Sequence, residues 1–270
     1  MSTGRQISSP NPPSGSPLAA PDGPGWLLLR GLVRERRHWG SFPERLAEST
    51  KSPVLCLDLP GVGTERDRPS PASIAGIVAD LRARFLPLRG DGQWAIFAPS
   101  LGGMIAMAWA DSHPTDFVHL AVCNTSTKDL GGIFQRFSPE ALRTVLAALP
   151  GALLGAAPEA REARTLGLVS NTPHGRAQAA VFAGYAREAP IGVDVLVRQL
   201  WAASRTNAPA SLSIPVTVMC SDGDRLCSPA ISRALAARLR AALHVHPDAG
   251  HDLPLDDPDW VIARLVEIAP

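Results

Sequence analysis

The stretch Trp94-Ala95-Ile96-Phe97-Ala98-Pro99-Ser100-Leu101-Gly102-Gly103-Met104 decides the fold of this 270-residue chain. An apolar run stops at Ser100, and two glycines then open a segment that is apolar on nearly every side. This order predicts a buried strand, a sharp turn that carries Ser100, and a buried helix. Such a turn, a nucleophile elbow, lifts a serine hydroxyl above the end of a parallel sheet. Ala98 stands where the usual Gly-x-Ser-x-Gly pattern has its first glycine, so the motif needs support from the rest of the chain.

Composition excludes several classes of protein. Hydrophobic residues make up 45% of the chain, which is enough for one large α/β domain. The formal net charge is +1, and acidic and basic residues are mixed, so neither nucleic acid nor an anionic membrane is predicted as a partner. No apolar run approaches the roughly 18 residues of a membrane span. No apolar core follows Arg5, so no secretory signal is predicted.

The cysteines indicate a reducing compartment. Cys56, Cys123, Cys220 and Cys227 lack the spacing of metal ligands, and the first three lie in or at the ends of predicted buried strands. We therefore expect buried, reduced thiols in a cytoplasmic protein without a metal. Cys220 and Cys227 flank a loop, and the sequence leaves their pairing open.

Strands and helices alternate through the first half of the chain. Residues 1–24 are rich in Ser, Pro and Gly and are predicted to form a disordered tail. Apolar runs then predict strands at 26–29, 53–57, 94–99 and 117–123. Helices are predicted at 42–50, after an N-cap at Ser70-Pro71, and after Ser100. This β-α-β-α-β-α-β order predicts a parallel sheet with right-handed crossovers.

The pattern changes at Asn124, where strands stop. Only helical segments are predicted up to about residue 209, at 139–149, 158–168, 175–187 and 192–204. We therefore expect a helical cap at 125–208, inserted into an α/β core at 25–124 and 209–270. One side of its last helix is apolar and is predicted to pack inward, in part over the site: Val193, Leu196, Val197, Leu200 and Trp201.

The sheet resumes after the insertion and supplies two partners for Ser100. Strands are predicted at 215–220 and 243–246, and helices after Ser228-Pro229 and Asp257-Pro258. Asp224 and His251 each follow one of these strands, in the order serine, acid, histidine. A serine hydroxyl needs a base and a third group that orients the base, so the sequence predicts a triad. Asp222 lies in the same loop and is the alternative acid.

These residues carry a family resemblance. The run from Leu29 to Trp260 resembles the α/β-hydrolase superfamily, in particular small esterases of the lipase, carboxylesterase and carrier-protein methyl-esterase kind. The resemblance implies a mainly parallel central sheet with helices on both faces and a helical lid, and its Asp-x-Leu pattern favours Asp224 as the acid. The matching motifs are Asp58-Leu59-Pro60-Gly61-Val62-Gly63, Ser100-Leu101-Gly102-Gly103, His113-Pro114, Asp224-Arg225-Leu226 and Ala249-Gly250-His251-Asp252-Leu253-Pro254.

The resemblance also implies an oxyanion hole built from two backbone N–H groups. One belongs to Leu101, after the nucleophile, and the other to Leu32, in the loop after the first strand. Relatives usually have His-Gly in that loop, whereas this chain has Arg30-Gly31. The arginines that begin this loop are predicted to be solvated, with recognition of an acidic substrate group as the alternative: Arg30, Arg34, Arg36 and Arg37.

The expected activity is hydrolysis of a carboxylic ester through an acyl-enzyme, with no cofactor and no metal. Ser100 Oγ is expected within hydrogen-bond reach of His251, on an elbow that Pro99 stiffens. Thioester hydrolysis, acyl transfer and carbon–carbon bond cleavage remain open because the same triad serves them. A non-catalytic binding protein of this fold is disfavoured by the complete triad. The substrate is expected to be a small ester, free or carrier-bound, and the chain a monomer or homodimer.

Overall fold

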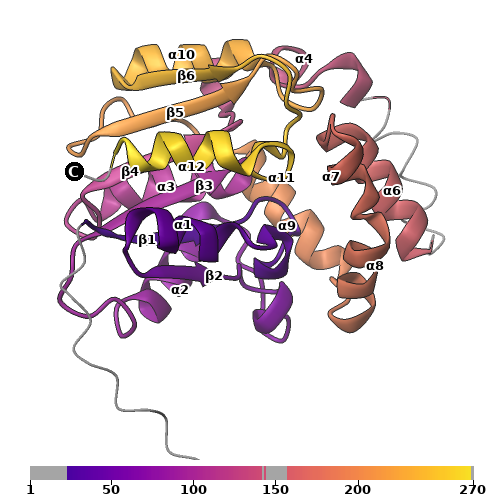
Figure 1. Cartoon of the computed structure of the whole chain (residues 1–270), viewed down its shortest axis with the longest axis horizontal. Coiled ribbons are helices and arrows are strands. Elements are labelled where there is room, and N and C mark those ends of the chain that lie inside the picture. The colour runs from indigo at the N-terminus through magenta and orange to yellow at the C-terminus, as the bar shows by residue number, and fades with distance from the viewer. Residues whose placement is uncertain (1–22, 142, 144–156, 269–270) are drawn as a thin grey trace, which may run out of the picture.

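One parallel sheet of six strands forms the centre of the molecule (Figure 1). The structure is a computed structural model that describes residues 23–141, 143 and 157–268. The strand order across the sheet is β2-β1-β3-β4-β5-β6, and every neighbouring pair is parallel. The strands are β1 (Gly25–Leu29), β2 (Val54–Leu57), β3 (Trp94–Pro99), β4 (His119–Cys123), β5 (Val216–Ser221) and β6 (Ala242–His246). All six predicted strands form, and the predicted fold class is confirmed.

Helices cover both faces of this sheet. One face carries α2 (Ile74–Phe85), α3 (Leu101–Ser112) and α10 (Pro229–Leu239). The other face carries α1 (Phe42–Thr50) and α12 (Pro258–Val266), with the short α11 (Leu253–Asp256) before α12. Short 3₁₀ helices are η1 (Arg36–Trp39), η2 (Gly63–Glu65) and η3 (Lys128–Leu130). The layers are therefore helix, sheet and helix, as the alternating elements require.

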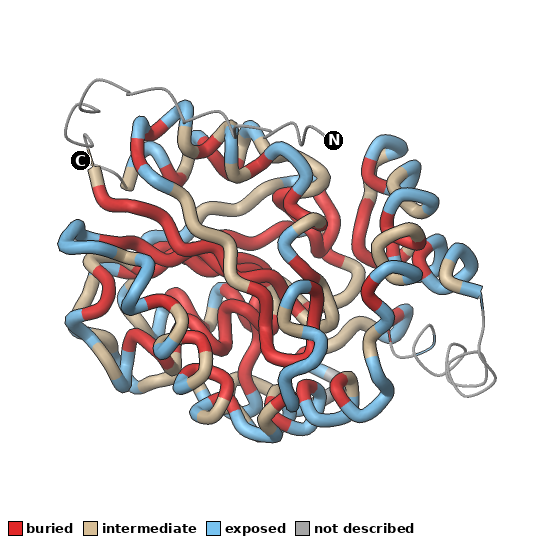
Figure 2. Tube along the Cα trace, turned by 90° about the horizontal axis from the view of Figure 1, so that it is seen from below, coloured by how far each residue is buried: buried red, intermediate tan, exposed pale blue. Residues whose placement is uncertain are grey.

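The two-residue period of the strands divides the core between these faces. In β1, Leu27 and Leu29 pack with α2 and α3, whereas Trp26 and Leu28 pack with α1 and α12. All five residues of β1 are buried, and Figure 2 shows the central strands as buried throughout. Each fully buried leucine contributes about 1.5–3 kcal/mol from the loss of water contact. The buried sheet therefore gives the loops that follow its strands a well-packed support.

Proline and serine start several helices. Pro229 and Pro258 begin α10 and α12 as predicted, and Asp257 accepts a hydrogen bond from the N–H of Trp260 at 2.9 Å. The prediction for α2 was wrong by one turn, because Ser73 rather than Ser70 caps it. The Ser73 hydroxyl accepts from the N–H of Gly76 at 3.2 Å, directly before the first buried residue of the helix.

The insertion between β4 and β5 is helical where the structure describes it. Its helices are α4 (Ile133–Arg136), α6 (Pro158–Val169), α7 (Pro173–Ala177), α8 (Ala179–Glu188) and α9 (Val193–Ser204). The helix predicted at 175–187 is divided into α7 and α8. Residues 139–141 and 143 are helical, and the rest of the helix predicted at 139–149 lies outside the described residues, as do residues 1–22 of the predicted tail. Helices α6 and α8 share a small core that contains Leu166 and Phe182.

The inward face predicted for α9 was wrong. Trp201 is 54% exposed, and Val193, Val197 and Leu200 are also exposed. The opposite side packs on the core through Val195 and Ala202, and it carries the fully buried Gln199. A polar partner therefore decides the rotation of this helix, because Gln199 bonds a loop of the core.

The structure tests the expectation of buried, reduced cysteines and the expectation that the chain has no membrane span. All four cysteines are free, so Cys220 and Cys227 do not pair. Cys123, Cys220 and Cys227 are buried as expected, whereas Cys56 on the edge strand β2 is only partly buried. Burial raises the pKa of Cys56 to about 12, so its thiol is protonated at neutral pH.

Across the described ranges, no helix combines the length and apolarity needed to cross a membrane.

Candidate active site

The sheet creates a crevice where its winding reverses. The chain leaves β1 toward β2 on one side, and it leaves β3 toward β4 on the other. Ligands of open α/β sheets bind in the crevice that such a reversal leaves at the carboxyl ends of the strands. Ser100 follows β3 directly, and the loop after β1 (residues 30–34, here the β1 loop) lies beside it. A Cβ at Gly31 would lie only 3.1 Å from the Cβ of Ser100.

Ser100 sits in a strained backbone conformation. Its φ is 55° and its ψ is −126°, a region that L-residues rarely adopt. The conformation is held from both sides: the Ser100 N–H donates to the Cys123 carbonyl at 2.8 Å, and the Thr125 hydroxyl donates to the Ser100 carbonyl at 2.7 Å. Strain of this kind persists only where surrounding contacts enforce it, as they do here.

The residues around Ser100 explain how Ala98 fits in the elbow. Ala98 is fully buried, and its methyl group faces the position where Gly102 lacks a side chain. A Cβ at Gly102 would lie 2.8 Å from the carbonyl oxygens of Leu29 and Arg30. Helix α3 can therefore approach the end of β1 only with glycine at 102. Because Gly102 has no side chain, it leaves room for the methyl group of Ala98, which stands where the usual motif has its first glycine.

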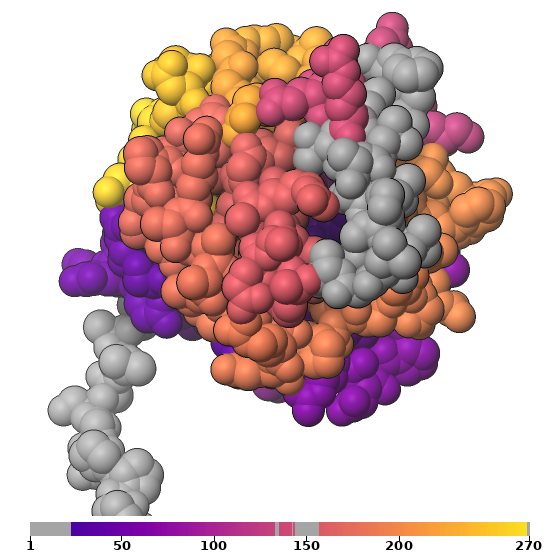
Figure 3. Space-filling model, turned by 90° about the vertical axis from the view of Figure 1, so that its right-hand side faces the viewer, coloured from indigo at the N-terminus to yellow at the C-terminus, as the bar shows by residue number. Residues whose placement is uncertain are grey.

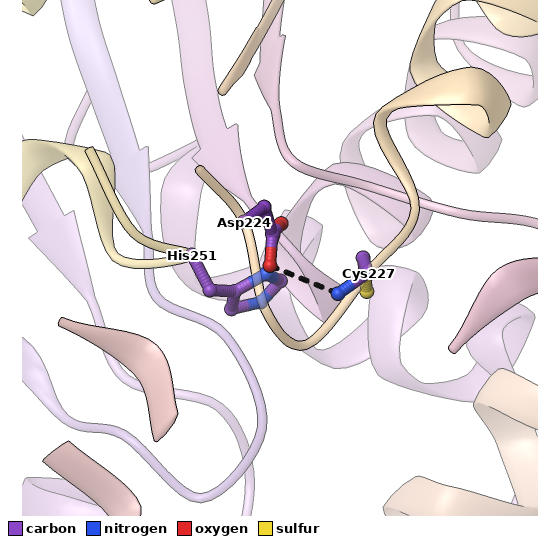
Figure 4. A group of neighbouring side chains, drawn as sticks. All are labelled: Asp224, Cys227 and His251. Carbon is purple, nitrogen blue, oxygen red and sulfur yellow. Dashed lines mark hydrogen bonds and ion pairs between the residues drawn. The ribbon is translucent and has the colours of Figure 1, made fainter. Parts of the chain in front are cut away.

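Asp224 and His251 lie together beyond β5 and β6. The Nδ1–H of His251 donates to Oδ2 of Asp224 at 2.8 Å, and both residues are buried. The other carboxylate oxygen, Oδ1, accepts from the N–H of Leu226 at 2.8 Å. It also accepts from the N–H of Cys227 at 2.9 Å, the bond drawn in Figure 4. Burial disfavours the charged imidazolium, but the Asp224 carboxylate, together with the neighbouring Cys227 side chain, outweighs it and raises the pKa of His251 well above its ordinary value.

The structure distinguishes between the two candidate acids. Asp222 is exposed and pairs with Arg233 at 2.5 Å on the surface. Its N–H donates to the carbonyl of His246, which extends the sheet but involves no carboxylate. Only Asp224 has its carboxylate at His251.

The expected hydrogen bond between Ser100 and His251 is absent. The Nε2 atom of His251 is buried and has no hydrogen-bond partner within the described part of the chain. Because Nδ1 is engaged by Asp224, Nε2 is the ring nitrogen left to exchange a proton. Hydrogen bonds of this kind are often long in enzymes without substrate and tighten in the complex.

The loop that carries His251 (residues 247–252, here the histidine loop) is bonded to the sheet by Asn124. The Asn124 amide donates to the carbonyl of His251 at 2.9 Å, and its Oδ1 accepts from the N–H of Ser221 at 2.9 Å. Asn124 has a φ of 45°, a left-handed conformation that asparagine tolerates better than most residues. It therefore joins the ends of β4, β5 and the histidine loop.

The insertion also bonds the histidine loop, through residues 169–172 (the insertion base). The Asp256 carboxylate accepts from the N–H groups of Asn171 at 2.8 Å and Gly250 at 2.7 Å, and from the Ser170 hydroxyl at 2.5 Å. The Asn171 amide donates to the carbonyls of Gly223 and Asp248, both at 2.8 Å. The loop between β5 and α10 that carries Asp224, the histidine loop and the insertion are thus joined by hydrogen bonds.

The β1 loop is a strained turn held by the insertion. The N–H of Arg34 donates to the carbonyl of Gly31 at 3.3 Å, with Leu32 and Val33 between them. Val33 has a φ of 47°, which is costly for a β-branched residue. Its N–H donates to Oε1 of Gln199 in α9 at 3.0 Å. No described group accepts a hydrogen bond from the N–H of Leu32 or of Leu101.

Two of the arginines expected to be solvated are not. Arg30 is only 4% exposed and pairs with Asp252, and Arg34 pairs with Glu162 of α6 at 2.7 Å. Arg36 is exposed, and Arg37 bonds Glu35. Sequence reasoning missed Arg30, Asn124 and Gln199 as parts of the site. The available signals were an arginine at the usual histidine position, the change of pattern at Asn124, and a polar residue within an apolar helix.

Asp224, Cys227 and His251 have ligand atoms within 4.8 Å of one another, and these are residue types that zinc accepts. Both oxygens of Asp224 are already engaged, however, by two backbone N–H groups and by His251. Nδ1 of His251 also carries the proton that it donates. A metal would have to displace these bonds, so the arrangement fits proton transfer better than metal binding.

The strained turn at Ser100 and the buried Asp224–His251 pair both lie at the carboxyl edge of a parallel sheet whose winding reverses. This arrangement is typical of a hydrolase fold. The chain belongs to the alpha/beta hydrolase family, whose model matches residues 26–264. No curated protein matches it in sequence.

Three solved structures illustrate the likeness in fold. A lipase from Acinetobacter baumannii, described as putative in its structure report, is 23% identical with a TM-score of 0.70, over 91% of this chain and 83% of the other. A thermophilic esterase from Thermogutta terrifontis is 24% identical with a TM-score of 0.68, over 91% and 89%. The thioesterase of the prodiginine pathway in Streptomyces coelicolor is 21% identical with a TM-score of 0.64, over 97% and 91%. At these identities the likeness concerns the fold.

Proposed function

We propose that this protein hydrolyses carboxylic esters, with Ser100 as nucleophile, His251 as general base and Asp224 as the group that orients the base. The observation that carries the proposal is the buried hydrogen bond from His251 Nδ1 to Asp224, which leaves Nε2 without a partner. The strained turn at Ser100 follows β3, at the same edge of the sheet. Family membership and the likeness in fold to a lipase and an esterase support hydrolysis as the reaction class.

The reaction proceeds through an acyl-enzyme. Ser100 Oγ attacks the ester carbonyl carbon while its proton passes to Nε2 of His251. The tetrahedral oxyanion accepts hydrogen bonds from the N–H groups of Leu32 and Leu101, neither of which is used within the described structure. Collapse breaks the bond to the alcohol, which leaves with the proton from His251. Water then repeats the sequence and releases the acid.

The insertion acts as the lid in this proposal. Helices α6, α7 and α8 lie beyond the strand ends in Figure 1, and α9 reaches the β1 loop through Gln199. Figure 3 looks onto the insertion and shows a hollow beside these helices, with atoms from the N-terminal part of the chain visible inside. The four free thiols agree with a cytoplasmic location. We assign the substrate to small esters, free or carrier-bound, and the chain to a monomer or homodimer.

A fluorophosphonate probe and a series of p-nitrophenyl esters test the proposal. Wild type should be labelled and should hydrolyse at least one ester, and Ser100→Ala should lose labelling and about 10⁶-fold in kcat. The control is Ser112→Ala, an exposed serine at the other end of α3, which should keep full activity. An unlabelled, inactive wild type would refute the hydrolase proposal, and activity in Ser100→Ala would refute the nucleophile.

Thioester hydrolysis is the second candidate, because the fold is also similar to that of a thioesterase. Acyl transfer and carbon–carbon cleavage would use the same groups. A matched pair of substrates, p-nitrophenyl butyrate and the butyryl thioester of N-acetylcysteamine, ranks the first two by kcat/KM. We expect the ester to be preferred, and a higher kcat/KM for the thioester would reverse the assignment.

A further inference from the structure

A buried ion pair joins the β1 loop to the histidine loop. Arg30 directly follows β1, and Asp252 directly follows His251, 222 positions later in the chain. The guanidinium bonds the carboxylate with both of its terminal nitrogens, Nη1 to Oδ1 at 3.1 Å and Nη2 to Oδ2 at 2.5 Å. Arg30 is 4% exposed and Asp252 is 8% exposed. This fork fixes both the distance and the angle between the two side chains.

Stability alone does not account for this pair. Removing two charges from water is costly, and apolar residues of similar size usually stabilise a fold as well or better. The Nε atom of Arg30 is also buried without a partner, which adds to the cost. A buried pair of this kind is therefore expected where geometry matters more than stability.

Both ends of the pair are held rigidly. The Arg30 guanidinium lies over the Trp39 ring at 4.6 Å, and that ring contacts Phe97 of β3, the strand that leads to Ser100. The N–H of Asp252 donates to the carbonyl of Val169 in the insertion base at 2.8 Å. The Arg30 side chain is thus packed on the core, and the backbone at Asp252 is bonded to the insertion base.

The pair connects the two groups that must act on one reacting centre. Leu32, the proposed oxyanion donor of the β1 loop, is two residues from Arg30, and His251 is adjacent to Asp252. We propose that Arg30 and Asp252 form a positioning strut that sets the distance between the Leu32 N–H and Nε2 of His251. The strut rests on the proposed function and touches no substrate.

Conservative variants test the strut. Arg30→Lys keeps the charge but loses the fork, and Asp252→Asn keeps the shape but loses the charge. Each should lower kcat about 10- to 100-fold with KM within twofold, because a shift of about 1 Å costs about 100-fold in rate. Inhibition by an aryl boronic acid, which forms a tetrahedral adduct, should weaken by the same factor. The double variant should be no worse than the poorer single variant, since both remove one interaction.

A second Arg–Asp pair provides the matched control. Arg45 of α1 bonds Asp259 of α12, also across a long sequence separation, but Asp259 is 82% exposed. Arg45→Lys and Asp259→Asn should leave kcat, KM and boronate inhibition unchanged. If the Arg30 and Asp252 variants keep kcat within twofold of wild type and lose only thermal stability, the pair is merely structural and the strut is refuted.

Amide hydrogen exchange separates failure of the strut from failure of the proposed function. Asp252→Asn should speed exchange in the β1 loop, and Arg30→Lys should speed exchange in the histidine loop, each at a distance from the change. Exchange that rises only in the mutated loop would refute the strut whatever the activity. An inactive wild type with cross-loop exchange would instead refute ester hydrolysis and leave the strut standing.

Discussion

The two halves of the site are built differently. On the acid–histidine side, hydrogen bonds engage both oxygens of Asp224, Nδ1 of His251 and the backbone of the histidine loop. On the serine side, Ser100 and Val33 have positive φ values, and the N–H groups of Leu32 and Leu101 have no acceptor among the described residues. The first half is satisfied, and the second is strained and open.

This difference follows from what each half has to do. Asp224 keeps its charge and position throughout the proposed reaction, so a complete set of partners stabilises it. The serine side must receive charge that appears only in the transition state, so its donors are set in place beforehand and left free. Four changes test this contrast, beginning with the largest expected effect.

The first change removes the charge of the acid. Asp224→Asn should lower kcat by about 10⁴-fold, because the imidazole loses the partner that selects its tautomer. Asp222→Asn, in the same loop but paired with Arg233 on the surface, should keep wild-type kcat. Steady-state kinetics with one p-nitrophenyl ester measures both, and a larger loss in Asp222→Asn would mean that the acid was assigned wrongly.

The pH profile of the same variant gives the sign of the electrostatic effect. His251 must be neutral to accept a proton, and Asp224 raises its pKa. Wild-type kcat/KM should therefore rise with pH along a limb above the ordinary histidine value of about 6.5. In Asp224→Asn the carboxylate charge is gone, and the limb should move to lower pH. A limb that stays in place or moves upward would contradict the stated cause.

The second change crowds the satisfied half. A Cβ at Gly250 would lie 2.5 Å from the carbonyl oxygen of Val169, which is backbone and cannot rotate away. Gly250→Ala should lower the free energy of unfolding by about 1–3 kcal/mol, in urea denaturation, and reduce kcat as His251 shifts. Gly92→Ala, with nothing within 4 Å, should change stability by less than about 0.5 kcal/mol. Equal free energies of unfolding for the two variants would show that the histidine loop can move to make room for the added methyl group.

The third change removes the hydrogen bond between the β1 loop and helix α9 of the insertion. Gln199→Leu removes the acceptor of the Val33 N–H and leaves that partly buried donor unpaired. We expect kcat/KM to fall about tenfold, the equivalent of one lost hydrogen bond. Leu200→Gln, at the next and exposed position of α9, should be neutral. A neutral Gln199→Leu would mean that the β1 loop holds its conformation alone.

The fourth change relaxes the strain itself. Val33→Gly allows the positive φ without steric cost but adds freedom to the unfolded chain, so stability should change by less than about 1 kcal/mol. Its kcat should still fall a few-fold, because the loop becomes mobile. Arg240→Gly relaxes a similar φ of 52° at the end of α10 and should leave kcat unchanged. Equal kcat in Val33→Gly and wild type would show that strain at Val33 has no role in rate.

The sequence predicted the sheet and the order of the polar loops well, for a physical reason. Buried parallel strands are nearly continuous apolar runs, and their carboxyl ends all lie at one edge. Ser100, Asp224 and His251 could therefore be placed at that edge from strand ends alone. Their mutual distances could not, and the missing bond between Ser100 and His251 illustrates this.

Long-range polar contacts were the part that sequence could not supply. The orientation of α9 depends on one bond from Gln199 to Val33, against an apolar pattern that favoured the opposite face. The burial of Arg30 depends on Asp252, 222 positions later in the chain, together with Trp39 of the following 3₁₀ helix. The periodicity of apolar residues indicates only which face of an element is apolar on average. In both cases a hydrogen bond or ion pair to one distant residue decided which side chain is buried.

The insertion base has a consequence for recombination between members of this fold. Residues 170–172, between α6 and α7, bond Asp256, and Asn171 also bonds the carbonyls of Gly223 and Asp248, so the insertion is bonded to the core in its middle and not only at its ends. A chimera that exchanges the helices for those of another protein, to change substrate range, has to keep residues 169–172 with the parent core. An exchange that begins after Thr172 replaces α7, α8 and α9 and keeps these bonds, whereas an exchange of the whole insertion at 125–208 also replaces the bonds of Asn171 to Gly223 and Asp248.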